Sequence, residues 1–392
     1  MKKLIDIIAG RVLTVSGFVT SIVILLIIGF LFTEAVGLFS NPVVEKGYVL
    51  AVNPANTVER LNAQQIKQIF DEEITNWKDV GGSDMPVKTF RLEDLDKYYS
   101  EKELGAEYEH AGKKIAEQIH KTPGIIAFVP DVLVKDQPDV RIMPDNNISV
   151  KDVLGGNEWF PTATPSPIFG ILPLISGTLW VSFFAILIAL PFGLAVSIYM
   201  AEVAHFKVRK ALKPIIELLN GIPSVVYGFF GLTIIVPFLQ NTFNLPVGES
   251  GLAGSIVLAI MALPTIITVA EDAMRSCPRS MREASLALGA TQWQTIYKVV
   301  IPFSMSGITS GVVLGIGRAI GETMAVLMVV GNAPVIPDSI SSPISTLTSQ
   351  IALDMSYSSG LHRSALFGMG VVLFIISAAL VGIVRLISKK RG

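Results

Sequence analysis

Cysteine, charge and histidine are scarce in this sequence, and each shortage argues against a class of protein. The single cysteine, Cys277, cannot form an intramolecular disulfide. Charged residues make up 16% of the chain, where soluble globular proteins carry about 25%. Four scattered histidines beside one cysteine give no metal-ligand spacing, and no catalytic triad or pair of catalytic carboxylates is recognisable. We therefore expect neither an enzyme nor a bound metal or cofactor.

Apolar runs are abundant instead. Hydrophobic residues form 51% of the chain. A membrane-spanning helix needs about 20 apolar residues, and several runs reach that length. The expected spans lie near residues 12–34, 173–200, 222–240, 251–271, 302–330 and 365–387. The sequence therefore predicts an all-α polytopic protein of the lipid bilayer with about six membrane helices.

The first apolar run differs from a cleaved signal peptide. It follows Lys2, Lys3 and Arg11, and it is longer than the about 7–15 apolar residues of a signal peptide. No convincing cleavage site of small residues comes after it. We expect residues 1–40 to form a retained signal-anchor helix.

The positive charges alternate with the expected spans. Cytoplasmic loops carry the excess of lysine and arginine. Positive residues gather in the two tails and in two loops: Lys2, Lys3, Arg11; Lys207, Arg209, Lys210, Lys213; Arg275, Arg279, Arg282, Lys298; Arg385, Lys389, Lys390, Arg391. The opposite short loops hold only Arg363. The pattern predicts a cell-membrane protein with both termini in the cytoplasm, and it explains the basic 271–300 loop without nucleic acid.

A polar segment, residues 41–167, separates the first two spans and is expected outside the cytoplasm. From residue 40 to residue 167 the chain has 21 Asp or Glu and 14 Lys or Arg. The expected strands and helices are, in order, Val49–Val52, Ala63–Phe70 with Asn62 as N-cap, Glu107–His120 and Ile125–Val129. Prolines and glycines over 154–167 indicate a linker back to the membrane. We expect an α/β extracytoplasmic insert.

The loop after the fourth span carries a distinctive pattern. Glu283 and Ala284 are followed by Gly289, and the loop closes on Ile301 and Pro302. A short helix over 281–288 would end at Gly289, which suits a C-cap, and a second helix would start at residue 290 or 291. Two such helices form a rigid knob on the cytoplasmic face. An ordinary amphipathic connector is the alternative interpretation.

Two ionisable residues, Arg318 and Glu322, lie inside the apolar run 301–331. A charge at membrane depth costs about 2.5–3.5 kcal/mol on insertion scales, so such residues are usually functional. Four positions apart, they would share one face of a helix. A guanidinium suits an oxyanion because its planar fork donates two hydrogen bonds, and Glu322 would hold Arg318 until an anion arrives. A buried structural ion pair is the alternative.

Two further features of this region concern packing and hydration. Gly315, Gly317 and Gly321 are expected to let neighbouring backbones approach closely. The hydroxyl-rich segment 339–349 either hydrates the path of an anion or forms a solvated loop, and we assign no site to it.

The motifs together resemble a known family. The 283–302 pattern is similar to the EAA loop of ABC-importer permeases, which docks into a cleft of the ATP-hydrolysing subunit. The chain also resembles phosphate-specific permeases of the PstC type over Asn220–Gly228, Gly317–Ala325, Gly331–Pro334 and Thr346–Ala352. This resemblance implies a type I ABC importer permease core over residues 168–392, with five spans and the coupling loop.

The resemblance also implies a function and partners. The chain would be the transmembrane permease of an ATP-driven importer of inorganic phosphate, with Arg318 and Glu322 in the substrate path. Its partners would be a homologous PstA-like permease, a dimer of PstB-like ATPase subunits and a PstS-like phosphate-binding protein. Gly112-Lys113 lacks the spacing of a phosphate-cradling loop, so the ATP chemistry must come from another chain.

The insert resembles part of a periplasmic phosphate-binding protein, through Leu61–Phe70, Ile74–Gly82, Val87–Arg91 and Thr122–Phe128. Those proteins follow the arginine with a Ser-Gly-Thr turn whose backbone N–H groups clasp phosphate. Here Arg91 is followed by Leu92-Glu93-Asp94, which adds negative charge where an anion would sit. We expect a degenerate single lobe that serves in docking or gating.

Three alternatives stay open from the sequence. The same machine could carry another oxyanion, such as sulfate or molybdate. A membrane sensor would use the insert as a receptor lobe, but no kinase, methyl-acceptor or dimerisation segment is recognisable. An enzyme of lipid or cell-wall metabolism would need a nucleophile or a metal cluster, and neither is recognisable.

Overall fold

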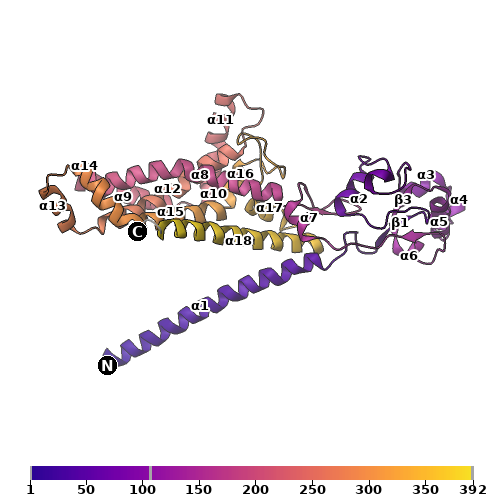
Figure 1. The fold of residues 1–392 in the computed structure, drawn as a ribbon, viewed down its shortest axis with the longest axis horizontal. Coiled ribbons are helices and arrows are strands. Elements are labelled where there is room, and N and C mark those ends of the chain that lie inside the picture. The colour runs from indigo at the N-terminus through magenta and orange to yellow at the C-terminus, as the bar shows by residue number, and fades with distance from the viewer. Residues whose placement is uncertain (1, 106–107, 390–392) are drawn as a thin grey trace. The chain divides into compact units, whose positions relative to one another are not determined.

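The computed structural model describes residues 2–105 and 108–389, and the side chains of 10–105, 108–384 and 386 (Figure 1). Several charges that predicted cytoplasmic termini, among them Lys2, Lys3, Lys390 and Arg391, therefore lie outside the described side chains. The chain forms two compact units, each described by itself. The membrane unit comprises residues 1–32, 171–358 and 366–392, and the insert unit comprises 33–170 and 359–365.

The described part of the membrane unit confirms the expectation of six spans. Six helices are long and apolar enough to cross a bilayer: Gly10–Phe39, Leu172–Val203, Ser224–Phe243, Gly251–Arg275, Gln292–Gly321 and Gly360–Val384. Three of them contain a π-helical turn, namely η3 (Tyr199–Val203), η4 (Gly231–Ile235) and η5 (Ile296–Val300). The helices are α1 (Lys2–Phe39), α8 (Leu172–Ile198), α9 (Phe206–Gly221), α10 (Ser224–Phe230), α11 (Val236–Phe243), α12 (Gly251–Arg275), α13 (Arg279–Ala287), α14 (Gln292–Thr295), α15 (Ile301–Gly321), α16 (Met324–Val329), α17 (Leu347–Asp354) and α18 (Gly360–Lys389).

Helix α12 is the centre of the membrane unit, and it packs along α8 and α15 (Figure 1). Close approach of α15 depends on three glycines spaced four residues apart. A Cβ at Gly307, Gly311 or Gly315 would meet α12 at 2.3, 3.2 and 2.8 Å, respectively. The prediction was right for Gly315 and wrong for Gly317 and Gly321, where a Cβ would meet nothing within 4 Å.

The expected helix over 302–330 is wrong at both ends. It begins earlier, because α14, η5 and α15 run continuously from Gln292, and it ends at Gly321. Glu322 is extended, with φ −71° and ψ 133°. Its freed carbonyl accepts a hydrogen bond of 2.8 Å from Thr348 Oγ1 of α17. Non-helical backbone at membrane depth is tolerated where such partners satisfy it.

The hydroxyl-rich segment continues into the interior of the membrane unit. Ser345, Thr346, Thr348 and Ser349 are all buried. Thr178 Oγ1 of α8 accepts from the backbone N–H of residue 347 at 2.9 Å, so this stretch is fastened to the helix bundle. The solvated-loop interpretation is therefore wrong for residues 345–349.

The insert unit is an α/β fold, as expected. Its four-stranded sheet has the order β2-β3-β1-β4. Strand β1 pairs antiparallel with β3 and β4, whereas β2 pairs parallel with β3. The strands are β1 (Tyr48–Val52), β2 (Lys88–Arg91), β3 (Ile125–Pro130) and β4 (Arg141–Ile142), and a separate hairpin joins β5 (Trp159–Phe160) to β6 (Ile168–Phe169).

Helices cover the sheet of the insert unit. They are α2 (Ala63–Phe70), η1 (Trp77–Val80), η2 (Leu92–Asp94), α3 (Leu95–Tyr98), α4 (Glu101–Leu104), α5 (Ala111–Lys121), α6 (Asp131–Val134) and α7 (Val150–Gly155). Helix α2 has the expected bounds, because Asn62 and Gln65 form a capping box. The expected 107–120 helix begins only at Ala111, and Glu107 lies outside the described residues. The expected 154–167 linker contains β5 and is thus partly ordered by hairpin pairing.

Candidate functional site

The coupling loop, residues 279–302, folds as two short helices joined by a tight turn. Helix α13 ends at Ala287, and Gly289 follows with φ +85°, a left-handed conformation that favours glycine. Thr291 then caps α14, and its side chain accepts from the backbone N–H of Gln294. The predicted pair of helices and the predicted turn at Gly289 are confirmed.

The coupling loop is fastened by polar contacts to η3, the π-helical turn that follows α8. Arg282 Nη2 donates to Glu202 Oε1 at 2.6 Å, and Arg282 Nη1 donates to the carbonyl of Cys277 at 2.6 Å. Between α13 and α14, the hydroxyls of Ser285 and Thr295 lie 2.9 Å apart. These contacts join α13 both to α14 and to η3.

The outer surface of the coupling loop exposes several apolar side chains among polar ones. Glu283 and Ala284 are exposed on α13, and Leu288 is 89% exposed. Further exposed apolar side chains are Met281, Leu286, Trp293 and Tyr297. Ile301, by contrast, packs against a buried cluster that includes Met274 and Val300, and Pro302 lies in the first turn of α15. The surface therefore has the composition of a docking site, with Ile301 and Pro302 at its junction with the membrane helices.

A buried carboxylate, Glu271 near the end of α12, forms ion pairs with basic residues of α9. It is 1% exposed and lies 2.6 Å from Arg209 Nε and 3.5 Å from Lys213 Nζ. Lys213 also bonds Asp272 at 2.9 Å, and that hydrogen bond raises the pKa of Lys213 above its usual range. This network is not among the predicted sites, although the acidic pair Glu271-Asp272, at the end of an apolar helix beside a basic loop, is a signal for it.

Arg318 and Glu322 are not the pair that their spacing predicted. Because α15 ends at Gly321, the two residues do not share one face of a continuous helix. No ion pair joins them among the described residues. Instead, Arg318 Nη1 donates to Asn220 Oδ1 at 2.5 Å, across 98 positions of sequence. The expectation that Glu322 holds Arg318 is therefore wrong in this structure.

The depth of Arg318 follows from the packing of α15 on α12. Gly307 lies against Ala273 near one end of α12, and Gly315 lies against Ile266. Arg318, one turn beyond Gly315, is thus level with the middle of α12, which spans Gly251–Arg275. A guanidinium in the middle of a membrane helix pair is rarely structural alone.

The insert unit has no open clasp for an anion at Arg91. Asp94 Oδ2 accepts the backbone N–H of Arg91 at 2.7 Å, and Lys97 Nζ donates to Asp94 Oδ1 at 2.6 Å. The Arg91 guanidinium stacks over the Phe70 ring, 5.3 Å from its centroid. The carboxylate of the chain itself therefore occupies the N–H donor that an anion would use.

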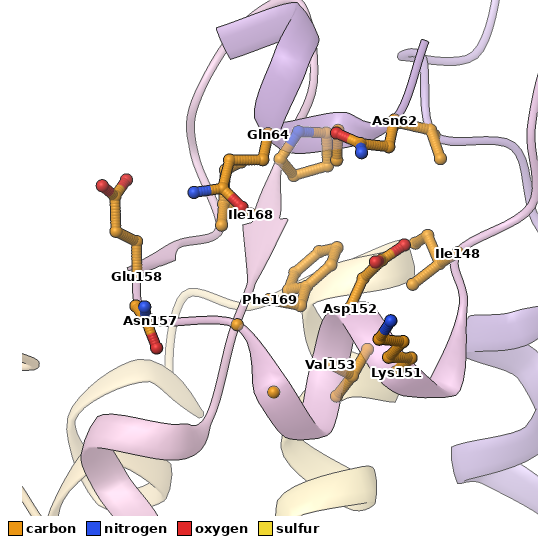
Figure 2. A pocket seen from close by; sticks show the side chains of 15 residues that line it. Asn62, Gln64, Ile148, Lys151, Asp152, Val153, Asn157, Glu158, Ile168 and Phe169 are labelled. Carbon is orange, nitrogen blue, oxygen red and sulfur yellow. The ribbon is translucent and has the colours of Figure 1, made fainter. Parts of the chain in front are cut away.

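A cavity of about 240 Å³ lies elsewhere in the insert unit, between the start of α2 and α7. Figure 2 shows Asn62 and Gln64 on one side and Lys151 and Asp152 on the other, with Phe169 between them. The four polar side chains are exposed. The cavity mixes both charge signs and thus does not select an anion.

Comparisons with known proteins match these two units. Residues 193–392 match the family described as the binding-protein-dependent transport system inner membrane component, and residues 31–132 match a PBP superfamily domain. The second match confirms the resemblance of the insert to part of a binding protein.

This chain aligns with most of the length of several related permeases. The probable ABC transporter permease protein YqgH of Bacillus subtilis is 45% identical over 248 residues, 63% of this chain and 80% of the relative. The phosphate transport system permease proteins PstC of Pasteurella multocida and Mesorhizobium japonicum are 37% and 36% identical, over 60% and 59% of this chain and 80% and 76% of theirs. A solved MetNI methionine ABC transporter chain is 19% identical with a TM-score of 0.45, a likeness too low to carry an argument.

The six spans, the folded coupling loop and the family match over half of the chain agree with one another. The protein belongs to the binding-protein-dependent transport system inner membrane components, the multi-pass permeases of ABC importers.

Proposed function

We propose that this chain is the permease subunit of an ATP-driven importer of inorganic phosphate. The observation that carries the proposal is Arg318, a guanidinium at mid-membrane depth whose partner is a neutral amide. Such a group offers its full positive charge to an anion. The similarity to phosphate transport system permeases supports phosphate as that anion.

Three parts of the chain have separate roles in such an importer. Residues 1–40 anchor the chain, residues 41–167 form an extracytoplasmic insert, and residues 168–392 form the permease core. Segments rich in lysine and arginine alternate along the chain with segments that have almost none, which supports cytoplasmic termini and a cytoplasmic coupling loop. A second, PstA-like permease would complete the path, a dimer of PstB-like ATPases would bind the coupling loop, and a PstS-like binding protein would deliver phosphate.

Coupling in this proposal is mechanical. The ATPase would bind the exposed apolar surface around Glu283, Ala284 and Leu288, and closure of the ATPase pair would displace the coupling loop. Because the loop continues without interruption through Ile301 and Pro302 into α15, its displacement tilts the helix that carries Arg318. Alternating access by such rigid-body motion is usual for transporters.

Glu322 takes a different role in the proposal from the one its spacing suggested. It lies at the break after α15, beside the hydroxyls of Thr178, Ser182 and Thr348. A carboxylate at this place repels anions that move away from Arg318. Because no ion pair joins Glu322 to Arg318 in the part of the chain that the structure describes, the guanidinium keeps its positive charge for the anion. Glu322 thus shapes the substrate path without neutralising it.

We propose that the insert unit is a docking or gating element of the importer and does not bind phosphate itself. Asp94 already accepts the Arg91 N–H, and the segment has an excess of acidic residues. Calorimetry on the full chain carrying Arg318→Gln measures phosphate binding by the insert, because this variant removes the proposed anion contact of the membrane unit. Micromolar phosphate binding that persists in this variant, and that is lost with Arg91→Gln, would overturn the assignment.

Transport in proteoliposomes tests the proposed function. The chain is purified with the proteins that accompany it in its own membrane, and ATP-dependent uptake of radiolabelled phosphate is measured with sulfate, molybdate and arsenate as competitors. We expect uptake that requires ATP and that sulfate and molybdate do not displace. If sulfate suppressed the uptake of labelled phosphate, phosphate would not be the specific substrate. If the isolated chain took up phosphate without an ATPase, the proposal would be refuted.

The variant Arg318→Gln gives the matching test of the path. It keeps hydrogen-bonding capacity and removes the charge. We expect the complex to assemble and phosphate uptake to fall about 10- to 150-fold, because a hydrogen bond to a charged group is worth about 1.5–3 kcal/mol and each 1.4 kcal/mol is about a factor of ten. Normal uptake would remove Arg318 from the path.

A further inference from the structure

The partner of Arg318 is a residue that the sequence analysis did not select. Arg318 Nη1 donates to Asn220 Oδ1 at 2.5 Å, and Thr265 Oγ1 lies 3.5 Å from the same oxygen. The three side chains come from α15, α9 and α12. None of them is negatively charged, and Arg318 forms no ion pair within the described part of the chain. This polar cluster, residues 220, 265 and 318, therefore keeps its positive charge.

Asn220 occupies a fixed position at the end of a helix. Helix α9 ends at Gly221, and Ile222 is extended, with ψ 129°, because Pro223 follows it. Tyr227 Oη of α10 donates back to the carbonyl of Leu219 at 2.7 Å, which ties the start of the next helix to this end. The backbone at Asn220 is therefore fixed independently of Arg318, and the side chain starts from a defined position.

The cluster is rich in hydrogen-bond donors. Arginine has several N–H groups, and the amide nitrogen of asparagine adds more. The contact with Arg318 occupies the Asn220 oxygen, and Asn220 Nδ2 makes no hydrogen bond to the described residues. Asn220 is exposed and Arg318 is half-buried. The unused donors are thus open to a ligand.

The depth of the cluster argues against contact of Arg318 with lipid. Arg318 is level with the middle of α12, as the packing of Gly315 on Ile266 shows. A guanidinium that faced hydrocarbon at that depth would be strongly disfavoured. An exposed cluster there is compatible with a hydrated path, and an oxyanion supplies the acceptors that the cluster lacks.

We propose that Asn220 is a positioning and specificity residue of this path. Its Oδ1 orients the Arg318 guanidinium, and its Nδ2 donates to the same tetrahedral oxyanion. The inference rests on the proposed function, because it adds a second residue to the same anion path. Neutrality is the essential property: a carboxylate at position 220 would pair with Arg318 and repel the anion.

The variant Asn220→Asp separates this role from a purely structural one. It keeps the size and the oxygen that accepts from Arg318, and it adds a negative charge. A residue that only ties α9 to α15 would do so at least as well, because the contact becomes an ion pair. We expect instead that phosphate uptake by the full complex falls about 10- to 100-fold at low phosphate, chiefly through a higher apparent KM, with unchanged co-purification of the ATPase.

Further variants keep the test decisive if Asn220→Asp does not assemble. Asn220→Leu has similar volume and no hydrogen-bonding groups, and it is expected to lose uptake to a similar extent. Its matched control is Thr233→Val, which breaks only a contact with the carbonyl of Phe229 in its own helix and should transport normally. Asn220→Gln, which retains the amide, is expected to recover part of the uptake.

The outcomes separate the role of Asn220 from the proposed import of phosphate. If the normal complex transports phosphate and Arg318→Gln does not, but Asn220→Asp and Asn220→Leu transport normally, the role of Asn220 is refuted while the proposed function stands. If the normal complex does not transport phosphate, the proposed function fails and this inference fails with it.

Discussion

Replacing Gly307 by alanine is expected to destabilise the membrane unit, whereas the same replacement at Gly317 is not. Both residues lie on α15, about three turns apart. At Gly307 the added Cβ would lie 2.3 Å from Cβ and 3.5 Å from Cα of Ala273. Carbon atoms in contact need about 3.5–4.0 Å, and Ala273 has no flexible side chain that can move aside. The two helices must therefore separate by on the order of 1 Å.

The pair of variants isolates the cost of that separation. Each replacement gains about 0.5–1 kcal/mol, because alanine is a better helix former than glycine. Overpacking costs about 1–3 kcal/mol, and it applies only at position 307, since a Cβ at Gly317 meets nothing within 4 Å. The difference between the two variants in free energy of unfolding should therefore be about 1–3 kcal/mol, with Gly317→Ala the more stable.

Unfolding of the purified chain in mixed detergent micelles, followed by tryptophan fluorescence, measures this difference. Gly315→Ala provides a third point, because its Cβ would meet the side chain of Ile266 at 2.8 Å, and a flexible side chain relaxes more easily than Ala273. The expected order of stability is Gly317→Ala, then Gly315→Ala, then Gly307→Ala. Equal stability of the three variants would refute the packing of α15 on α12 described here.

Three further predictions concern the coupling loop, the buried carboxylate and the insert. Gly289→Val forces a β-branched residue into a left-handed turn, at a cost of about 1–2 kcal/mol, and should abolish co-purification of the ATPase; retained co-purification would argue against docking at this turn. Glu271→Gln removes the buried counter-charge of Arg209, while Lys213 keeps Asp272, and it should destabilise the membrane unit by about 1–3 kcal/mol; faster tryptic cleavage of 206–221 would show this, whereas the exposed Glu217→Gln should have no effect. In the insert, the hydrogen bond with Asp71 raises the pKa of Lys67 above its ordinary 10.5. The folded pKa exceeds the unfolded one, so this contact stabilises the insert below pH 10.5 and its contribution is lost as the pH rises through the folded pKa. Protease resistance of the insert between about pH 9 and 12 should fall less steeply in Lys67→Met, and identical profiles would contradict the pairing.

Local signals in the sequence predicted the local structure well. Asn62 and Gln65 form a capping box that any reading of spacing can find, and α2 has the expected bounds. Gly289 and Thr291 mark the turn between α13 and α14 in the same way. In each case the residues that decide the conformation lie within a few positions of one another.

The arrangement around Arg318 could not be read from spacing. Its partner Asn220 lies 98 positions away, so the i to i+4 spacing with Glu322 suggested the wrong pair. The break after Gly321 is equally non-local, because the freed carbonyl of Glu322 is satisfied by Thr348. An apolar sequence continues on both sides of the break, and hydropathy alone therefore predicts one uninterrupted span.

The contact between Arg282 and Glu202 joins the coupling loop to a third span. The chain itself joins the loop to α12 on one side and, through α14 and η5, to α15 on the other. The 2.6 Å ion pair adds η3, the last turn of the span Leu172–Val203. The two helices that pack along α12 are therefore linked at this end by the same loop, and one displacement of the loop would reach both of them.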